Sequence, residues 1–434
     1  MLTSLDHNAL VQSTRSVLTA NRVHLGSHRY TRPAPGTYEQ LWLWDSCFHA
    51  IALRHYDIGM AWDELHAILA HQVSEGDDEG MVPHMTYWRG GGAMLWGNPN
   101  RSIITQPPLI ALAASLILVA ARASGSEASA LAHLAGLYPK LVGYHNWFDR
   151  RRDVMGNGLS VLIHPWETGL DASPRWDAPM GFSGDDTRAV NAHSGRPDPD
   201  SAHYYANAHD NRLRGARIAL AHHIRERGCN ARELCDAGSF CVAPVDFNSL
   251  RSMDLCAMVE LARSVGQERD VPGWLARIER LRGAVQSTFF SGDDLIATEA
   301  LPGRAERLGY EDGIAQYLAL AGNCATGAQA NRLAERLRVL LDDASQWPIS
   351  TTPTHAHAFA PRRYWRGNVW VQLNWLVWMG LKRRGFEVLA KRLAERTVAL
   401  LHAHGLHEYF DPITGTGHGS SPHSWNAIVV DMMQ

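Results

Sequence analysis

Apolar residues recur at helical spacing along almost the whole chain, and this periodicity limits the possible folds more than any other feature of the sequence. Phe48, Ile51 and Ala52 share one face of a helix, and Leu389 and Leu393 share a face of another. Alternation of apolar and polar residues, which is typical of half-buried strands, is rare. The sequence therefore predicts an all-α protein.

About twelve helices are predicted, each with ends uncertain by ~3 residues. Their ranges are 8–21, 46–56, 60–74, 108–123, 128–150, 202–227, 249–265, 271–288, 311–321, 327–342, 368–384 and 386–404, with a further short helix at 424–432. No fixed repeat length relates them, so a closed barrel of helical hairpins, the (α/α)6 toroid, fits better than an open solenoid. Because no interdomain linker is apparent, residues 1–434 are predicted to form a single domain.

Composition argues against several classes of function. The chain has 434 residues and a formal net charge of -3, which gives no electrostatic reason to expect nucleic acid as a partner. The most apolar stretch, 109–121, is shorter than the roughly 20 residues that a membrane-spanning helix needs. The N-terminal residues lack the apolar core of a signal peptide. We therefore expect a soluble cytoplasmic protein with no membrane partner, and homo-oligomer formation stays open.

Neither the cysteines nor the histidines show the spacing of a metal site. The 6 cysteines are scattered without a CxxC pair, so we expect reduced structural thiols, with Cys47 packed on its helix. His402, His404 and His407 lie close together, but at this spacing on a helix end the three side chains cannot all face one point. We expect no metal and no cofactor.

The segments between the predicted helices carry most of the tryptophans and the motif-like acids. Loops of this kind on a helical scaffold predict a site assembled at one end of the scaffold. The longest irregular stretch, 178–203, is rich in Gly, Pro, Asp and Ser, and we expect it to be a flexible loop or lid.

Two of these segments place a polar side chain beside aromatic residues or prolines. In YEQLWLWDSCF, Tyr38, Trp42 and Trp44 precede Asp45 at the start of a helix, where an N-cap role explains the aspartate equally well. In SIITQPPLIA, Gln106 precedes two prolines, a pattern that usually marks a bend. The alternative for both is a sugar site, because the C–H faces of sugars pack on aromatic rings.

Two further regions carry the remaining acids. HPWETGLDASPRWD contains Ser173 and Pro174, which are explained as a helix N-cap, whereas Asp171 has no such explanation. YWRGNVWVQLNW is followed by HEYFDPITGTGHGSSPHSW, which contains Glu408, and a solvated surface acid is the plain alternative for this glutamate. Breaking a glycosidic bond without a metal usually takes two carboxyl groups near aromatic faces, and the four stretches meet that description.

Taken together, these stretches resemble glycoside hydrolase family 63, and specifically its bacterial branch of glucosylglycerate and mannosylglycerate hydrolases. The resemblance rests on WDSCF, GMVPH, ITQPP, WETGLDASPRWD, EDGIAQY, YWRGNVW and HEYFDPITG, which occur in the family's order. It implies a catalytic (α/α)6 barrel without a metal. The implied activity is that of an inverting α-glycosidase acting on a small α-linked gluco- or manno-configured glycoside.

The resemblance also implies roles for individual residues. Asp171 is expected to be the general acid and Glu408 the general base. The sugar-binding positions fall on Tyr38, Trp42, Trp44, Asp45, Gln106, Gly169 and Trp365, with Trp166 and Arg366 assigned to the same surface. We expect the pKa of Asp171 to be raised by burial under Trp166 and Trp176 and by neighbouring acids. We expect Glu408 to be ionised, with the two carboxyl groups roughly 6.5–9.5 Å apart.

The identity of the leaving group stays open. Family members carry an Asp-Arg-Tyr segment whose arginine binds the glycerate carboxylate, and His203 stands at the corresponding place here. Arg89, Arg101 or Arg212 could take over this role from another direction. The predicted partner is therefore a small carbohydrate, either a glycosylglycerate or a neutral α-glucoside, α-mannoside or short oligosaccharide.

Two other functions fit the same fold. A sugar epimerase or isomerase would work through paired histidines at the mouth of the barrel and would not need Asp171 or Glu408. A carbohydrate-binding protein without catalysis would keep the tryptophans and could lose either acid. The presence of both acids favours the hydrolase.

Overall fold

The computed structural model describes residues 4–182, 208–303, 307–308, 313–361 and 363–434. Of the predicted lid at 178–203, only the first five residues, 178–182, belong to this part of the chain. His203 lies outside the described residues, as does the side chain of Arg212.

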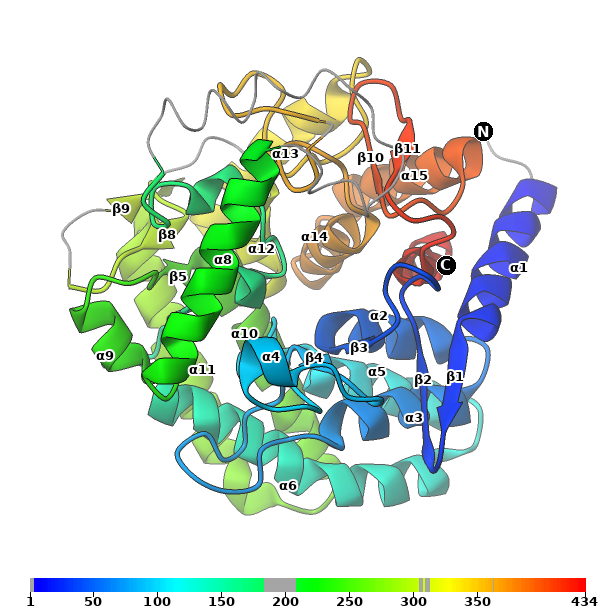
Figure 1. The fold of residues 1–434 in the computed structure, drawn as a ribbon. Helices are drawn as coiled ribbons and strands as arrows, with labels where there is room; N and C mark the ends of the chain where they lie inside the picture. Colours follow the sequence, from blue (N-terminus) through cyan, green and yellow to red (C-terminus); the bar gives the residue numbers. More distant parts are fainter. Residues whose placement is uncertain (1–3, 183–207, 304–306, 309–312, 362) are drawn as a thin grey trace.

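Helices dominate the described part of the chain (Figure 1), and all twelve predicted long helices are confirmed. They are α1 Ser4–Ala20, α2 Leu43–Leu53, α3 Ile58–Leu69, α5 Ile110–Ala123, α6 Glu127–Arg151, α8 Ala208–Glu226, α10 Val245–Ser264, α11 Val271–Phe289, α12 Ile314–Ala321, α13 Gly327–Asp342, α14 Val371–Arg383 and α15 Glu387–His404. The short helix expected at 424–432 is a 3-10 helix, η5, spanning Ser424–Met433.

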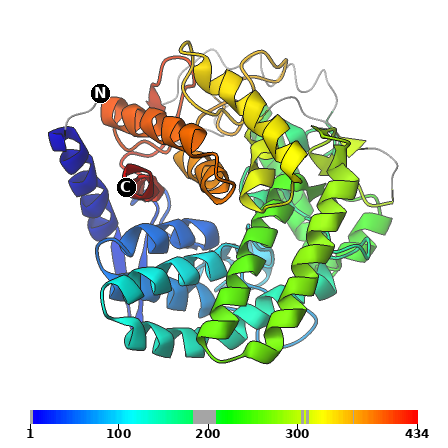
Figure 2. The same cartoon turned by 180° about the vertical axis from the view of Figure 1, so that it is seen from behind.

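The helices form two concentric rings, which confirms the (α/α)6 toroid. In the inner ring α2 contacts α5, α5 contacts α10, and the series continues through α12, α14 and η5 back to α2. Outside this ring α3 and α6 pack on α5, α11 on α10, and α15 on α14. Figures 1 and 2 show this ring from its two ends.

The composition of each helix matches its layer. Every residue of the inner helix α12, IAQYLALA, is buried, as expected for a helix that is apolar on all sides. The outer helix α13 buries one stripe, including Ala330, Leu333 and Leu337, and exposes the rest. It begins with a capping box between Thr326 and Gln329.

Connections on the two ends of the ring differ strongly in length. Residues 54–57 join α2 to α3, 124–126 join α5 to α6, and 384–386 join α14 to α15. The connections at the other end run over 21–42, 70–109, 152–244, 343–370 and 405–423. Because the predicted site residues lie in or beside these long connections, the architecture collects them at one end, as the sequence indicated.

The short elements lie in the connections between the long helices. These are helices α4 Ala93–Trp96 and α9 Ala231–Asp236, 3-10 helices η1 Pro165–Thr168, η2 Pro174–Trp176 and η4 Glu268–Asp270, and strands β3 Leu41–Trp42, β4 Met85–Thr86, β5 Ala243–Pro244, β6 Phe290–Ser291, β7 Asp294–Leu295, β8 Glu299–Ala300, β9 Arg307–Leu308, β10 Tyr409–Phe410 and β11 Gly417–His418. Near the N-terminus β1 Arg22–Leu25 pairs with β2 His28–Thr31. All these pairings are antiparallel, and most strands have two residues, too few to produce a sequence alternation.

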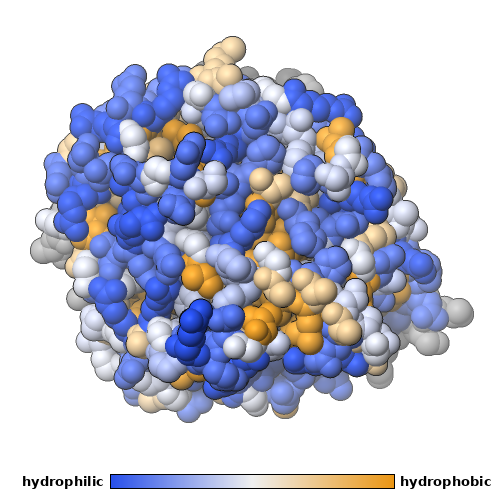
Figure 3. Space-filling model, turned by 90° about the horizontal axis from the view of Figure 1, so that it is seen from below, coloured by the Kyte–Doolittle hydropathy of each residue, from blue (hydrophilic) through white to orange (hydrophobic). Residues whose placement is uncertain are grey.

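The surface of the molecule is mainly polar on the face that Figure 3 shows. Apolar residues are interspersed among the polar ones on this face, and none of the described helices is both long and apolar enough to span a bilayer.

Cys47 is fully buried on α2, as expected. The expectation of reduced thiols is wrong for Cys235 and Cys241, which form a disulfide because the chain after α9 turns back and brings their Cα atoms within 5.4 Å.

The crossing of α12 and α14 depends on a glycine. A Cβ atom at Gly380 would lie 2.6 Å from the backbone nitrogen of Ala321, closer than packed atoms tolerate. We predict that Gly380→Ala lowers the free energy of unfolding by about 1–3 kcal/mol because the two helices are forced apart. Urea denaturation followed by circular dichroism measures the change.

Gly283→Ala is the matched control, because a methyl group at this position on α11 would have no atom within 4 Å. There the higher helix propensity of alanine is expected to raise stability by up to about 1 kcal/mol. Equal effects of the two substitutions would contradict the packing argument.

Candidate active site

Glu167 stabilises the loop that carries Asp171. This carboxylate is fully buried and accepts hydrogen bonds from Arg152 at 2.6 and 3.1 Å. The backbone N–H groups of Thr105 and Ile163 donate to it at 3.2 and 2.8 Å. Glu167 thus ties two loops and the end of α6 together, and its bonding capacity is used inside the protein.

Asp177, ten positions further on, has a comparable structural role. It accepts a hydrogen bond of 2.5 Å from Nη2 of Arg366, and both side chains are buried. Beside it, Arg175 binds Asp246 at 2.7 and 3.0 Å and also pairs with Glu299. These ion pairs attach the 164–177 loop to its neighbours. Nε and Nη1 of Arg366 have no hydrogen-bond partner among the described residues.

Asp171 is the acid of this loop that takes no part in these structural ion pairs. Its side chain is 16% exposed, and its Oδ2 lies 3.6 Å from Nη1 of Arg217. Burial raises the pKa of Asp171, while the charge of Arg217 and the Trp365 indole act to lower it. The direction agrees with the sequence-based expectation, but the charged neighbour is an arginine from α8 instead of another acid.

Glu408 is completely buried at the entry to the β10–β11 hairpin. Its Oε1 accepts a hydrogen bond of 2.7 Å from the Tyr38 hydroxyl, and its Oε2 accepts one of 3.0 Å from the backbone N–H of Ser420. Burial raises the pKa of Glu408, whereas the donors at Ser420, Tyr38 and Tyr364 lower it. The solvated-surface interpretation of this glutamate is therefore wrong.

Gly419 leaves the space that Glu408 occupies. Its φ is +69°, and a Cβ atom there would lie 2.4 Å from Oε2 of Glu408. Only glycine combines this backbone conformation with so close an approach. The sequence analysis did not single out Gly419, although it stands in the quoted GTGHGSS stretch.

Tyr364 belongs to the group of hydrogen-bonding side chains around Glu408, and the sequence analysis missed it. Its hydroxyl lies 3.1 Å from that of Tyr38, and its φ of +55° is unusual for a residue with a side chain. Burial raises the pKa of Tyr364, and the negative charges of Glu408 and Asp171 raise it further. Both carboxyl groups therefore act on the same hydroxyl. Its position next to Trp365 in YWRG was the available signal.

Aromatic rings form a continuous series that includes Tyr38, the hydrogen-bond donor to Glu408. Trp166 stacks near His84 with ring centroids 6.3 Å apart, and His84 meets Trp42 edge-on at 5.5 Å. Trp42 in turn lies 6.0 Å from Tyr38. His84, which ends the GMVPH motif, is a further member of the wall that the sequence analysis did not name as a site residue.

A second aromatic group continues the wall from Tyr364. The ring centroid of Trp365 lies 5.5 Å from that of Tyr364 and 6.3 Å from that of Trp44. Trp365 also stacks on the buried Trp370 at 3.4 Å. The predicted aromatic residues therefore belong to one connected cluster of rings.

The remaining predicted residues surround Trp44. The backbone N–H of Trp44 donates to Oε1 of Gln106 at 3.3 Å, and the indole covers Gly169, whose φ is +77°. Asp45 is 5% exposed, and burial raises its pKa to about 8, with a contribution from the charge of Glu408. The N-cap alternative for Asp45 is wrong, because Trp42 is the N-cap of α2 and Asp45 lies in its first turn.

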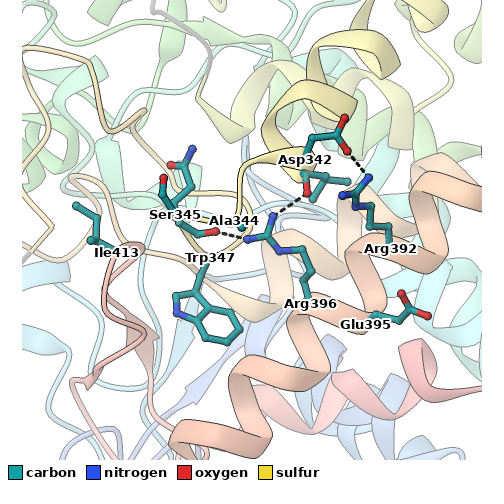
Figure 4. Close-up of a pocket in the computed structure, with 10 residues that line it drawn as sticks. Asp342, Ala344, Ser345, Trp347, Arg392, Glu395, Arg396 and Ile413 are labelled. Carbon is teal, nitrogen blue, oxygen red and sulfur yellow. Dashed lines mark hydrogen bonds and ion pairs between the residues drawn. The ribbon is translucent and has the colours of Figure 1, made fainter. Parts of the chain in front are cut away.

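A pocket of 470 Å³ lies elsewhere, between α13 and α15 (Figure 4). Trp347 and Ile413 line it together with charged residues, and no predicted site residue does. The guanidinium of Arg396 in this pocket donates to the carbonyls of Leu341 and Asp343 at 2.9 and 3.0 Å. These groups serve local structure, so we do not place the predicted site here. Within the described ranges, no cluster of three or more His, Cys, Asp or Glu side chains could bind a metal ion.

Comparison with known proteins gives a consistent result over nearly the whole chain. The sequence model of the mannosylglycerate hydrolase MGH1-like glycoside hydrolase domain matches residues 38–426. Mannosylglycerate hydrolase MGH1 of Selaginella moellendorffii is 31% identical, over 92% of this chain and 81% of the relative. Mannosylglycerate hydrolase of Thermus thermophilus is 30% identical, over 92% and 95% of the two chains. Glucosylglycerate hydrolase of Mycolicibacterium hassiacum is 28% identical, over 92% and 93%.

Solved structures agree with the sequence comparisons. The crystal structure of GH63 mannosylglycerate hydrolase from Thermus thermophilus in complex with Tris superposes with a TM-score of 0.83. The two sequences are 27% identical, and the match covers 98% of this chain and 99% of that chain. A second structure of the same protein contains Tris and D-glycerate and gives a TM-score of 0.82.

The contact between Gly169 and Trp44 generates a prediction. A Cβ atom at Gly169 would lie 2.5 Å from Cη2 of Trp44, so alanine must displace a rigid, buried indole. We predict that Gly169→Ala lowers the free energy of unfolding by at least ~1 kcal/mol more than Gly181→Ala does. Gly181 has a similar φ of +80° with open space around it, so its substitution carries only the conformational term. Chemical denaturation of both variants measures the difference, and equal destabilisation would contradict the close contact.

Proposed function

The chain belongs to glycoside hydrolase family 63, in the branch of the mannosylglycerate and glucosylglycerate hydrolases, and from this premise we propose that it cleaves glycosylglycerates with inversion. In this proposal Asp171 is the general acid and Glu408 the general base. The enzyme is thus a glycoside hydrolase acting on a small glycoside, with glucose or mannose at the cleavage subsite and glycerate as the leaving group.

The arrangement of Glu408 carries the proposal. This buried carboxylate accepts hydrogen bonds from Tyr38 and Ser420, both of which stabilise its ionised form against the effect of burial. Asp171, whose pKa burial raises, acts on the hydroxyl of Tyr364 together with Glu408. Inversion requires one carboxyl group that delivers a proton and one carboxylate that activates water. We assign the first role to Asp171 and the second to Glu408, whose hydrogen-bond donors favour its ionised form.

The reaction follows from these roles. Asp171 gives its proton to the glycosidic oxygen while the bond from this oxygen to the anomeric carbon breaks. Glu408 removes a proton from a water molecule that attacks the anomeric carbon from the opposite face. A carboxyl separation of roughly 6.5–9.5 Å, which leaves room for that water, stays a prediction.

The surrounding residues are proposed to hold the sugar. Trp42, Trp44, Trp166 and Trp365 offer apolar ring faces to its C–H groups, and Gln106, Gly169 and Arg366 complete the subsite. Because the pKa of Asp45 is raised to about 8, its carboxyl group is mainly protonated at neutral pH. Such a group both donates and accepts hydrogen bonds, which suits a sugar hydroxyl.

The histidines of the site support hydrolysis over epimerisation. Burial lowers the pKa of His84 and of His164 to about 3. Both imidazoles therefore stay neutral near pH 7 and are poor proton carriers there. An epimerase that works through histidines would need rings that gain and lose protons near neutral pH.

The organisation of the whole chain also enters the proposal. We propose that residues 1–434 act as one catalytic domain, because the inner ring closes only when η5 near the C-terminus packs on α2 near the N-terminus. A cytoplasmic location stays a prediction from the sequence.

Proton NMR of the reaction tests the proposed function. The enzyme is incubated with glucosylglycerate, mannosylglycerate, trehalose, kojibiose, nigerose and isomaltose, and the anomeric signals are followed in time. We expect a glycosylglycerate to be consumed with the β-anomer of the free sugar appearing first. The α-anomer appearing first would contradict the assigned roles, and consumption of a neutral disaccharide alone would contradict the leaving group.

The hydrogen bond from Tyr38 predicts a pH effect. Without this donor the ionised form of Glu408 is less stable, so the pKa of Glu408 rises and the base loses its proton only at higher pH. In Tyr38→Phe we expect kcat/KM to fall roughly tenfold more at pH 5 than at pH 8, as the loss of a hydrogen bond to a charged group implies. Tyr56→Phe removes a hydroxyl that contacts Thr14 and Val11 away from the site. The same pH dependence in both variants would count against the assignment.

A further inference from the structure

Arg217 lies directly beside the proposed general acid. Its Nη1 is 3.6 Å from Oδ2 of Asp171, and the two side chains are 5% and 16% exposed. The carbonyl of Arg217 accepts a hydrogen bond of 2.9 Å from Nε2 of His164. Because Nδ1 of this imidazole accepts the N–H of Trp166 at 3.0 Å, Nε2 carries the proton. His164 therefore fixes α8 against the loop that bears Asp171.

The charge of Arg217 opposes the task of Asp171. A guanidinium group stays positively charged at all relevant pH values, and here it lowers the pKa of Asp171 while burial raises it. A general acid has to hold its proton at the pH of the reaction. The nearest N–O distance of 3.6 Å is longer than a hydrogen bond. Arg217 and Asp171 therefore interact electrostatically, without a hydrogen bond between these two atoms.

The chemistry of a glycosylglycerate places a negative charge at the same position. When glycerate is linked through its O2 atom, the carboxylate carbon is two bonds away from the glycosidic oxygen. Asp171 must reach that oxygen to protonate it, so the carboxylate of the leaving group arrives beside Asp171. A guanidinium that already lies against Asp171 is within reach of this carboxylate.

We propose that Arg217 couples the charge of the leaving group to the proton on Asp171. In the empty site its positive charge favours ionised Asp171, and a bound carboxylate compensates that charge so that Asp171 holds the proton it will donate. The proton then passes to the glycosidic oxygen as the bond to the anomeric carbon breaks, and glycerate leaves with its hydroxyl restored. Arg217 is a positioning residue in this scheme, and the inference rests on the proposed function of Asp171.

The other groups that face Asp171 do not provide this coupling. Among the described residues, its backbone N–H and the Trp365 indole also act on its carboxyl group, and both lower the pKa. Neither carries a charge that a substrate could compensate. The hydroxyl of Tyr364 is neutral, since its pKa is raised.

A comparison of two substrates on the unmodified enzyme provides the first test. One is the glycosylglycerate, and the other is the matching glycosylglycerol, in which a neutral CH2OH group replaces the carboxylate. The pH profile of kcat/KM reports the free enzyme, and that of kcat reports the complex. For the glycosylglycerate we expect the alkaline limb of kcat to lie about one pH unit or more above that of kcat/KM. For the glycosylglycerol the two limbs should coincide, and coincidence for both substrates overturns the inference.

Substitutions on α8 identify the residue responsible. In Arg217→Gln the alkaline limb of kcat/KM is expected to move upward by about one pH unit, and the difference between the charged and the neutral substrate should disappear. Arg217→Lys keeps the charge and should restore that difference in part, which a purely structural role would not predict. Arg214→Gln removes a charge from an exposed position on the same helix and should leave both limbs in place. Unchanged limbs in Arg217→Gln would overturn the inference.

Asp171→Asn separates the two possible failures. If the wild-type enzyme cleaves no glycoside, or if Asp171→Asn retains the wild-type rate, the proposed function fails and the inference fails with it. If Asp171→Asn abolishes cleavage while the wild-type limbs coincide for both substrates, the general acid is confirmed and only the role of Arg217 is rejected.

Discussion

Closure of the inner ring is the constraint on which the rest of the structure depends. The seam lies where η5 packs between α2 and α14, and Asp431 bonds to both sides of it. Its carboxylate accepts a hydrogen bond of 3.0 Å from the indole of Trp375 on α14 and pairs with Arg54 and His55 at the end of α2. Because Arg54 and His55 lie far from Asp431 in the sequence, closing the ring depends on long-range contacts between the two ends of the chain.

The site follows from this closure. The hydrogen bond between Tyr38 and Glu408 joins residues separated by 370 positions, and it forms because η5 returns the end of the chain to α2. The acids of the 164–177 loop divide their roles for a related reason. Glu167 and Asp177 are bound by the arginines Arg152 and Arg366, and these ion pairs hold the loop while the side chain of Asp171 stays partly exposed beside Arg217.

The sequence predicted the helices well and the geometry of the site in part. Helical periodicity identified each long helix, since the burial of one face is a local pattern. Asp171 and Glu408 were predicted as the catalytic acids because they stand in motifs with a recognisable order. The direction of the pKa shift of Asp171 was predicted, but its charged neighbour was not. Arg217 lies on α8, and nothing in the sequence around it indicates that it contacts Asp171. The disulfide of Cys235 and Cys241 was missed, because nothing in their spacing separates it from reduced thiols.

By itself the sequence determined the class of fold and the order of the motifs, and it predicted Asp171 and Glu408 as the catalytic acids, because helical periodicity and motifs are patterns of neighbouring residues. Only the tertiary structure decided which groups meet. It brought the hydroxyl of Tyr364 within 3.1 Å of that of Tyr38, set Gly419 against Glu408 and placed Arg217 beside Asp171. Each of these contacts joins residues that are not neighbours in the sequence. Their relative positions depend on the packing of the whole barrel, which no local pattern of residues encodes.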